Sequence, residues 1–108
     1  MDANIKKIYD MMYSPIITPY NIVENAKLDN YTYVKYYKSG DELIAEMECE
    51  IANEGIKIFF YYFDKKDYLQ RIFMKDGEVT QKVFDRLTEI EKAKEEYYET
   101  KEGCYSVI

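Results

Sequence analysis

The chain has 108 residues, 47% of them hydrophobic, which is enough for one core of ordinary size and too little for a second. It contains no histidine, and this excludes Ser-His-Asp and Cys-His nucleophile arrangements and histidine-bearing zinc sites. Fifteen basic and 21 acidic side chains leave a net charge of -6. Such a chain is poorly suited to a sequence-independent grip on DNA or RNA, which depends on Lys and Arg at phosphates. We therefore expect one domain over residues 1–108 that binds no nucleic acid directly.

The cysteines and the N-terminal segment give no sign of a bound cofactor or of export. Cys49 and Cys104 have no CxxC spacing and no histidine with which to share a metal ion. No stretch approaches the roughly 18 apolar residues of a membrane-spanning helix, and the segment MDANIKKIYD lacks the apolar run of a signal peptide. We expect a reduced, cytoplasmic protein without a cofactor, a metal ion or a membrane contact.

Residues 3–13 are expected to form a helix, because their apolar side chains recur at helical spacing. These side chains are Ile5, Ile8, Tyr9 and Met12. Pro15 disfavours helical geometry in the residue before it and marks the end of this helix. A second, short helix follows if Thr18 acts as its N-cap and Pro19 as its first residue. The alternative is an irregular connection over residues 14–30.

From residue 31 the apolar residues alternate with a period of two, which is typical of β-strands. Turn-forming residues divide residues 31–84 into successive strands. The expected strands cover residues 31–38, 42–51, 56–63, 68–75 and 78–84. Short connections favour antiparallel pairing of consecutive strands, so we expect a β-meander.

The last helix is expected over residues 88–100. Thr88 and Glu91 have the spacing of a capping box at its start. Its expected inward stripe consists of Ile90, Ala93, Lys94 and Tyr97. Residues 101–108 form a tail, which is either frayed or added to the sheet as an edge strand. The predicted fold class is α+β: an antiparallel meander of about five strands, with one or two N-terminal helices and a C-terminal helix packed on one face.

The second strand carries the clearest chemical pattern of the sequence. Its apolar phase consists of Leu43, Ala45, Met47, Cys49 and Ile51. Its other phase, apart from Ile44, is acidic: Glu42, Glu46, Glu48 and Glu50, with Asp41 in the preceding turn. Residues 1–40 hold five bases and four acids, whereas residues 41–108 hold ten bases and 17 acids. We expect the five acidic residues to dock on a basic protein partner; the alternative is a solvated face whose charges discourage aggregation.

Metal binding and acid catalysis by the same carboxylates find less support. A divalent metal ion needs several oxygens within about 2.0 to 2.6 Å, which carboxylates two residues apart on one strand do not supply alone. General acid catalysis needs surroundings that raise the pKa of one carboxyl group, and no cleft is predicted around an open row of glutamates. We therefore expect no enzymatic activity.

The third strand is apolar or aromatic in both phases, so we place it in the centre of the sheet. The phase expected to face the helices consists of Ile56, Ile58, Phe60 and Tyr62. Phe59, Tyr61 and Phe63 then form an exposed aromatic patch or line a pocket. A second copy of the chain, in a homodimer through the sheet, would cover this patch, and so would the N-terminal segment folded over that side. Tyrosines on the strands also suit base stacking, but their acidic neighbours oppose it.

Together these features favour a small acidic protein-binding module without catalysis. In size, acidity and lack of catalytic residues it resembles the small inhibitors of bacteria and phages, such as immunity and anti-defence proteins. This resemblance rests on composition, assigns no site, and implies inhibition by occlusion of a basic site on a partner protein. The alternative is a small-molecule or peptide-binding domain whose curved sheet closes around an aromatic pocket.

Overall fold

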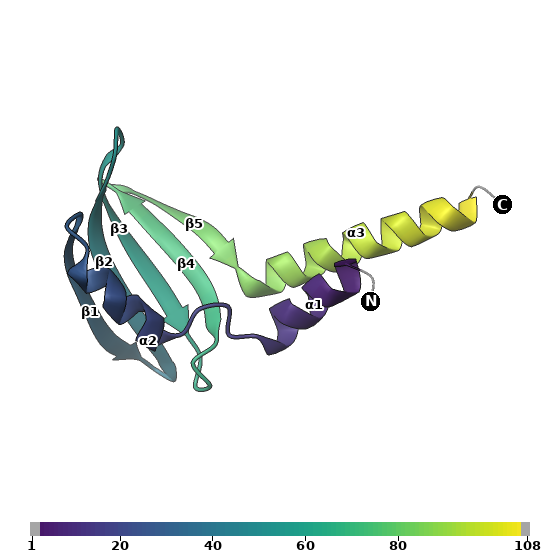
Figure 1. Ribbon diagram of the computed structural model, residues 1–108, viewed down its shortest axis with the longest axis horizontal. Coiled ribbons are helices and arrows are strands. Elements are labelled where there is room, and N and C mark those ends of the chain that lie inside the picture. The colour runs from purple at the N-terminus through teal and green to yellow at the C-terminus, as the bar shows by residue number, and fades with distance from the viewer. Residues whose placement is uncertain (1–2, 107–108) are drawn as a thin grey trace. The chain divides into compact units, whose positions relative to one another are not determined.

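The computed structural model describes the backbone of residues 3–106 and the side chains of residues 5, 6, 8–12 and 14–99 (Figure 1). The chain forms two compact units: Pro15–Asp85 is one, and the segments up to Ser14 and from Arg86 form the other. The elements in chain order are α1 (Ala3–Tyr13), α2 (Pro19–Ile22), the 3-10 helix η1 (Val23–Lys27), β1 (Tyr31–Ser39), β2 (Glu42–Ile51), β3 (Gly55–Phe63), β4 (Leu69–Asp76), β5 (Val79–Asp85) and α3 (Arg86–Ser106). Within residues 3–106, no helix has the length and apolar character that a membrane crossing requires.

The unit Pro15–Asp85 is built around one five-stranded sheet, whose strands lie side by side in chain order, β1-β2-β3-β4-β5 (Figure 1). Every neighbouring pair is antiparallel, as expected for strands joined by short turns. Two turns contain a glycine, Gly40 and Gly77, each at φ 61°, where a side chain would introduce strain. The predicted α+β class and the five-stranded meander are confirmed.

The core of this unit lies between α2 and one face of the sheet, which we call the inner face (Figure 1). Side chains no more than 2% exposed form its centre: Ile22, Ala45, Met47, Phe63 and Leu69. Ile22 is the last residue of α2. Burying a side chain of this size contributes about 1.5 to 3 kcal/mol, which explains how a one-turn helix is held on the sheet.

The predicted capping role of Thr18 is confirmed. Its hydroxyl accepts a hydrogen bond from the Asn21 N–H at 3.3 Å, and the Asn21 side-chain oxygen accepts one from the Thr18 N–H at 2.9 Å. Pro19 occupies the first helical position, where its missing N–H is not needed. The segment left open between helix and irregular connection is therefore a short capped helix that continues into η1.

The third strand is central, as predicted, but its two phases are exchanged. Leu43, Ala45 and Met47 of β2 lie opposite Phe63, Tyr61 and Phe59 of β3, respectively. Phe63 is 0% exposed, and the other two rings pack against the core. The prediction that Phe59, Tyr61 and Phe63 form an exposed patch is therefore wrong. The alternative, that the N-terminal segment covers this side, holds instead, because Ile22 of α2 lies in the same buried cluster.

Lys57 explains why the pattern of β3 was misleading. It shares the inner-face phase with Phe59, and its polarity suggested that this phase faces solvent. In the structure Lys57 is 7% exposed, and its ammonium group forms an ion pair with Asp76 at 2.6 Å. A buried charge is tolerated when it is paired in this way, so one lysine does not turn the phase outward.

In the other unit, α1 packs against α3. Arg86, the first residue of α3, is 4% exposed, and its guanidinium donates to the Met11 carbonyl and, at 2.8 Å, to the Ser14 carbonyl. The last carbonyls of a helix have no partners within it, and a cation is favoured at this end of the helix dipole. Arg86 therefore caps α1 at the point where α3 begins.

Helix α3 extends beyond the predicted range at both ends. It begins directly after Asp85, the last residue of β5. Thr88 and Glu91 therefore lie inside the helix, and the predicted capping box is wrong. The segment expected as a tail over residues 101–108 is helical through Ser106, and its last two residues lie outside the described residues.

The inward stripe of α3 is confirmed in part. Ala93 is 0% exposed and Ile90 and Tyr97 are half-buried, whereas Lys94 is exposed. Lys94 belongs to the same helical stripe by its spacing, so its exposure follows from its charge, which favours solvent. The packing of this helix on the sheet and the single domain over residues 1–108 stay predictions.

Phe63→Ala is expected to lower the free energy of unfolding by about 3 to 5 kcal/mol, because it leaves a cavity in the centre of the core. Phe60→Ala is the matched control, because it removes the same atoms from a half-buried position on the other face, and we expect it to cost no more than about 1.5 kcal/mol. Urea unfolding followed by circular dichroism measures both. Equal losses would contradict the observed phase of β3.

Candidate functional site

The face of the sheet opposite the core, which we call the outer face, carries its side chains in columns along the strands. The acidic column on β2 consists of Glu42, Glu46, Glu48 and Glu50. The apolar column on β3 consists of Ile56, Ile58, Phe60 and Tyr62. The column on β4 and β5 is mainly basic: it contains Arg71, Lys75 and Lys82, with Phe73 and Thr80 between them and Asp85 opposite Arg71. On β1, the outer face carries Tyr33, Lys35 and Tyr37.

Glu46 is the centre of a polar cluster at the border of β1 and β2. The Tyr33 hydroxyl donates to one carboxylate oxygen at 2.7 Å and the Tyr37 hydroxyl to the other at 2.9 Å. The Lys35 ammonium lies 3.3 Å from the same carboxylate and 5.4 Å from the centre of the Tyr33 ring. These groups are cross-strand neighbours on one face of the sheet, so the register of β1 and β2 assembles the cluster.

The cluster keeps Glu46 ionised. Burial acts to raise the pKa of Glu46, but the hydrogen bonds from Tyr33 and Tyr37 and the charge of Lys35 hold this pKa below its ordinary value. Burial and the hydrogen bond to Glu46 raise the pKa of Tyr33 to about 12, and the same two causes raise the pKa of Tyr37 to about 12. Both hydroxyls therefore remain donors and the carboxylate remains an acceptor across the physiological pH range.

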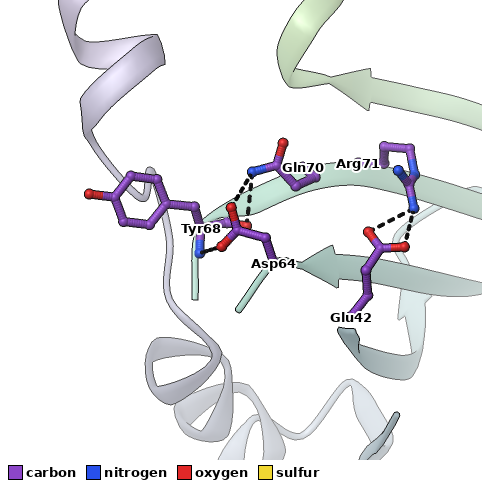
Figure 2. Close-up of polar contacts among 5 residues, drawn as sticks. All are labelled: Glu42, Asp64, Tyr68, Gln70 and Arg71. Carbon is purple, nitrogen blue, oxygen red and sulfur yellow. Dashed lines mark hydrogen bonds and ion pairs between the residues drawn. The ribbon is translucent and has the colours of Figure 1, made fainter. Parts of the chain in front are cut away.

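Glu42 forms the second internal ion pair of the outer face (Figure 2). The Arg71 Nη2 donates to both of its oxygens, at 2.7 and 2.8 Å. The Arg71 guanidinium also lies 4.8 Å from the centre of the Tyr62 ring, and Tyr62 in turn meets Phe73 edge to face, with ring centres 5.5 Å apart. These contacts connect the acidic column to the apolar and basic columns across β3.

The turn between β3 and β4 is ordered by one carboxylate (Figure 2). Asp64 accepts hydrogen bonds from the backbone N–H groups of Lys66 and Tyr68 at 2.9 and 3.0 Å, and from the Gln70 side chain at 3.0 Å. An aspartate that binds nearby backbone in this way stabilises the turn itself. Asp64 therefore has a structural explanation and is not a candidate binding residue.

The five predicted docking residues share one region but not one environment. Glu42 and Glu46 are engaged by cations of the same unit. Asp41 lies in the turn before β2, 3.6 Å from Lys65, with side chains 80% and 74% exposed, a pair that contributes little. Glu48 and Glu50, unlike these two, make no ion pair with another described residue. The four glutamates thus lie on one face as expected, but only part of their charge is available to a partner; their partner-binding role stays a prediction.

A shallow hollow of about 430 Å³ lies over β3, β4 and β5 on the outer face. Its walls are the aromatic rings of Phe60, Tyr62 and Phe73, and its polar groups come from Lys75 and Thr80. No pattern in the sequence singled out Phe73, Lys75 and Thr80, since only the register across three strands brings them together. The alternation of Arg71, Phe73 and Lys75 along the fourth strand was the available signal.

Among the described residues, no group of three or more Cys, Asp or Glu side chains is arranged to hold a metal ion. Comparison of the chain with protein-family models, with curated proteins and with solved structures finds no match. The interpretation of the outer face therefore rests on its own geometry.

Glu46→Gln is expected to lower the free energy of unfolding at pH 7 by about 1 to 3 kcal/mol, because hydrogen bonds to an ionised group are lost or weakened. Since the pKa of Glu46 is lowered in the folded state, its charge stabilises the fold above the ordinary pKa of about 4.5, and this contribution is lost as the pH falls through the folded-state pKa. The difference between wild type and variant should therefore shrink below about pH 4.5.

Urea unfolding of both proteins between pH 7 and pH 3 measures this difference. Glu54→Gln, at an exposed position in the turn between β2 and β3, controls for the loss of one negative charge. A difference that stays constant with pH would show that the hydrogen bonds do not depend on the charge of Glu46.

Proposed function

We propose that this chain is a non-catalytic protein-binding module that docks on a partner protein through the outer face of its sheet and acts by occlusion. The single observation that carries this proposal is the apolar column of β3, continued by Phe73, between two columns of opposite charge. Protein interfaces combine aromatic residues at the centre with a polar rim. The outer face has this composition.

The aromatic side chains are suitable anchors for such an interface. Phe60, Tyr62 and Phe73 are half-buried, so each ring already has a defined position and still presents surface to a partner. The cation–π contact of Arg71 with Tyr62 restricts this ring further. Ordered rings lose little conformational entropy on binding, which is why a few of them supply most of the affinity of many interfaces.

The acidic column favours a basic surface on the partner. Glu50 is exposed and Glu48 partly exposed, and neither forms an ion pair with another described residue, so their charge is left for a partner to compensate. Opposite charge on the partner would set the orientation of docking and accelerate association. Occlusion of a basic site would make the chain an inhibitor of the immunity or anti-defence type, a function in line with its small size and acidity. We further propose that it acts in the cytoplasm of a bacterium, as a cellular or phage protein, where the buried Cys49 stays a thiol.

A second candidate function is favoured by the hollow over β3, β4 and β5. Three aromatic walls with one ammonium and one hydroxyl group would suit a planar ligand or a peptide side chain that carries an anionic group. The hollow is open and shallow, as a protein contact requires, and for this reason we rank a ligand second. A rise in melting temperature with a metabolite panel would favour the ligand.

The double variant Tyr62→Ala/Phe73→Ala is expected to lose its partner, because it removes two central anchors; retention in a pull-down should fall by roughly tenfold or more. The tagged protein is incubated with lysate of its native host at about 50 mM salt, where screening is weak, and captured proteins are identified by mass spectrometry. A basic partner should also elute as the salt concentration rises.

Tyr20→Ala is the matched control. Tyr20 lies on α2, on the other side of the sheet, and is 74% exposed. A partner that is retained by the outer-face variant and lost by the Tyr20 variant would contradict the assignment of the docking face to the outer face.

A further inference from the structure

One row across the outer face contains two charges of opposite sign, neither of which has an ion-pair partner in the part of the chain that the structure describes. Glu48 in β2 lies opposite Ile58 in β3, and Ile58 lies opposite Lys75 in β4. Glu48 and Lys75 are therefore two strand spacings apart, about 10 Å, which is beyond the range of a direct ion pair. Neither makes an ion pair with another described residue, whereas Glu42, Glu46 and Lys82 do.

Two copies of this row are complementary when they are related by a two-fold rotation. Consider an axis that runs parallel to β3 between two copies packed face to face. Rotation by 180° about this axis places β2 of one copy over β4 of the other and keeps each residue at its own level along the strands. Glu48 of each copy then faces Lys75 of the other, and Ile58 faces Ile58. In a two-fold interface every such contact occurs twice.

The other two-fold axis in the same plane, perpendicular to the strands, gives the opposite result. It places β2 over β2 and β4 over β4, so that the acidic columns oppose each other. Like charges in contact are unfavourable. The Glu48–Lys75 row therefore favours the first of the two face-to-face arrangements. In that arrangement Lys35 and Lys82 also come to face each other, but each is already paired with an acid of its own copy.

We propose that the outer face binds a second copy of this chain, in a two-fold dimer in which Glu48 of each copy pairs with Lys75 of the other. The inference rests on the proposed function, in which the outer face is an interface, and it identifies a second copy of the chain as one protein bound there. The aromatic hollow, which Lys75 lines, lies over β3, β4 and β5, and the Glu46 cluster lies over β1 and β2. The rotation places the cluster of each copy over the hollow of the other.

The size of the face sets the strength of the dimer. Strand spacing and rise give an area of roughly 400 to 600 Å² per copy. This is near the lower limit of specific interfaces, about 1,200 Å² in total. The dimer should therefore be reversible and depend on protein concentration, and a tighter partner at the same face would displace one copy.

Sedimentation velocity of the full chain over a range of concentrations, at low and at high salt, tests association. A shift from monomer to dimer with rising concentration, weakened by salt, is expected. The variants Glu48→Lys and Lys75→Glu each create two like-charge contacts, and each should weaken the dimer at least about tenfold. Glu54→Lys and Lys66→Glu, at exposed positions in turns, are matched charge reversals that should leave the dimer unchanged.

Mixing the two outer-face variants is the decisive step. In a heterodimer of the Glu48→Lys and Lys75→Glu chains, both contacts again join opposite charges, one pair as in the wild type and the other with its signs reversed. Two proteins that are monomeric alone should therefore associate in a 1:1 mixture. A chain that is monomeric at every concentration would overturn the inference. So would single variants that still dimerise, or a mixture that remains monomeric. Circular dichroism checks that each variant folds; Glu48→Gln and Lys75→Met replace any variant that does not, and each should weaken the dimer.

Failure of this inference and failure of the proposed function have different signatures. If the chain stays monomeric while Tyr62→Ala/Phe73→Ala loses a captured partner, only the second copy is excluded. If the dimer follows the charge pattern while the same double variant retains its partner, only the docking of that partner on the outer face is excluded.

Discussion

Burial of the Phe63 side chain against Ile22 determines which face of the sheet packs in the core and which carries the candidate site. Because Phe63 is enclosed by Ile22, Ala45 and Leu69, the alternation of β3 turns Phe60 and Tyr62 to the opposite face. The β2–β3 register then brings Glu46 beside Phe60, and Ile44 beside Tyr62. A shift of one residue in this register would exchange the two faces completely. The composition of the candidate site is thus a consequence of core packing by the neighbouring residue in the same strand.

Much of the fold was predictable because its signals are local. The period of two, the turn residues and the Thr18 cap each depend on a few neighbouring residues, and they correctly indicated the meander and the short second helix. The phase of β3 was not predictable, since both of its phases are aromatic and the buried Lys57 finds its partner in Asp76, 19 residues away. The beginning of α3 depends on the contact of Arg86 with carbonyls of the N-terminal segment, which no local pattern contains.

The candidate site was predictable in part for the same reason. Alternation along β2 placed the glutamates on one face, but it could not show that Arg71, 29 residues from Glu42, neutralises that carboxylate. The basic column arises only when β4 and β5 are placed beside β3. The acidic row of β2 is therefore only one side of the outer face, whose other side is basic. The net negative charge of the chain gives no sign of this division.

The buried thiol of Cys49 has a practical consequence for the sheet. Cys49 is 3% exposed, near one end of β2, between Tyr31 of β1 and Lys57 of β3. Burial raises the pKa of its thiol, so little of the reactive thiolate exists in the closed sheet at neutral pH. A small alkylating reagent can reach the sulfur atom only when β1 or the cover of the inner face moves aside. The rate of alkylation at Cys49 therefore reports how often this end of the sheet opens, without the introduction of a new residue.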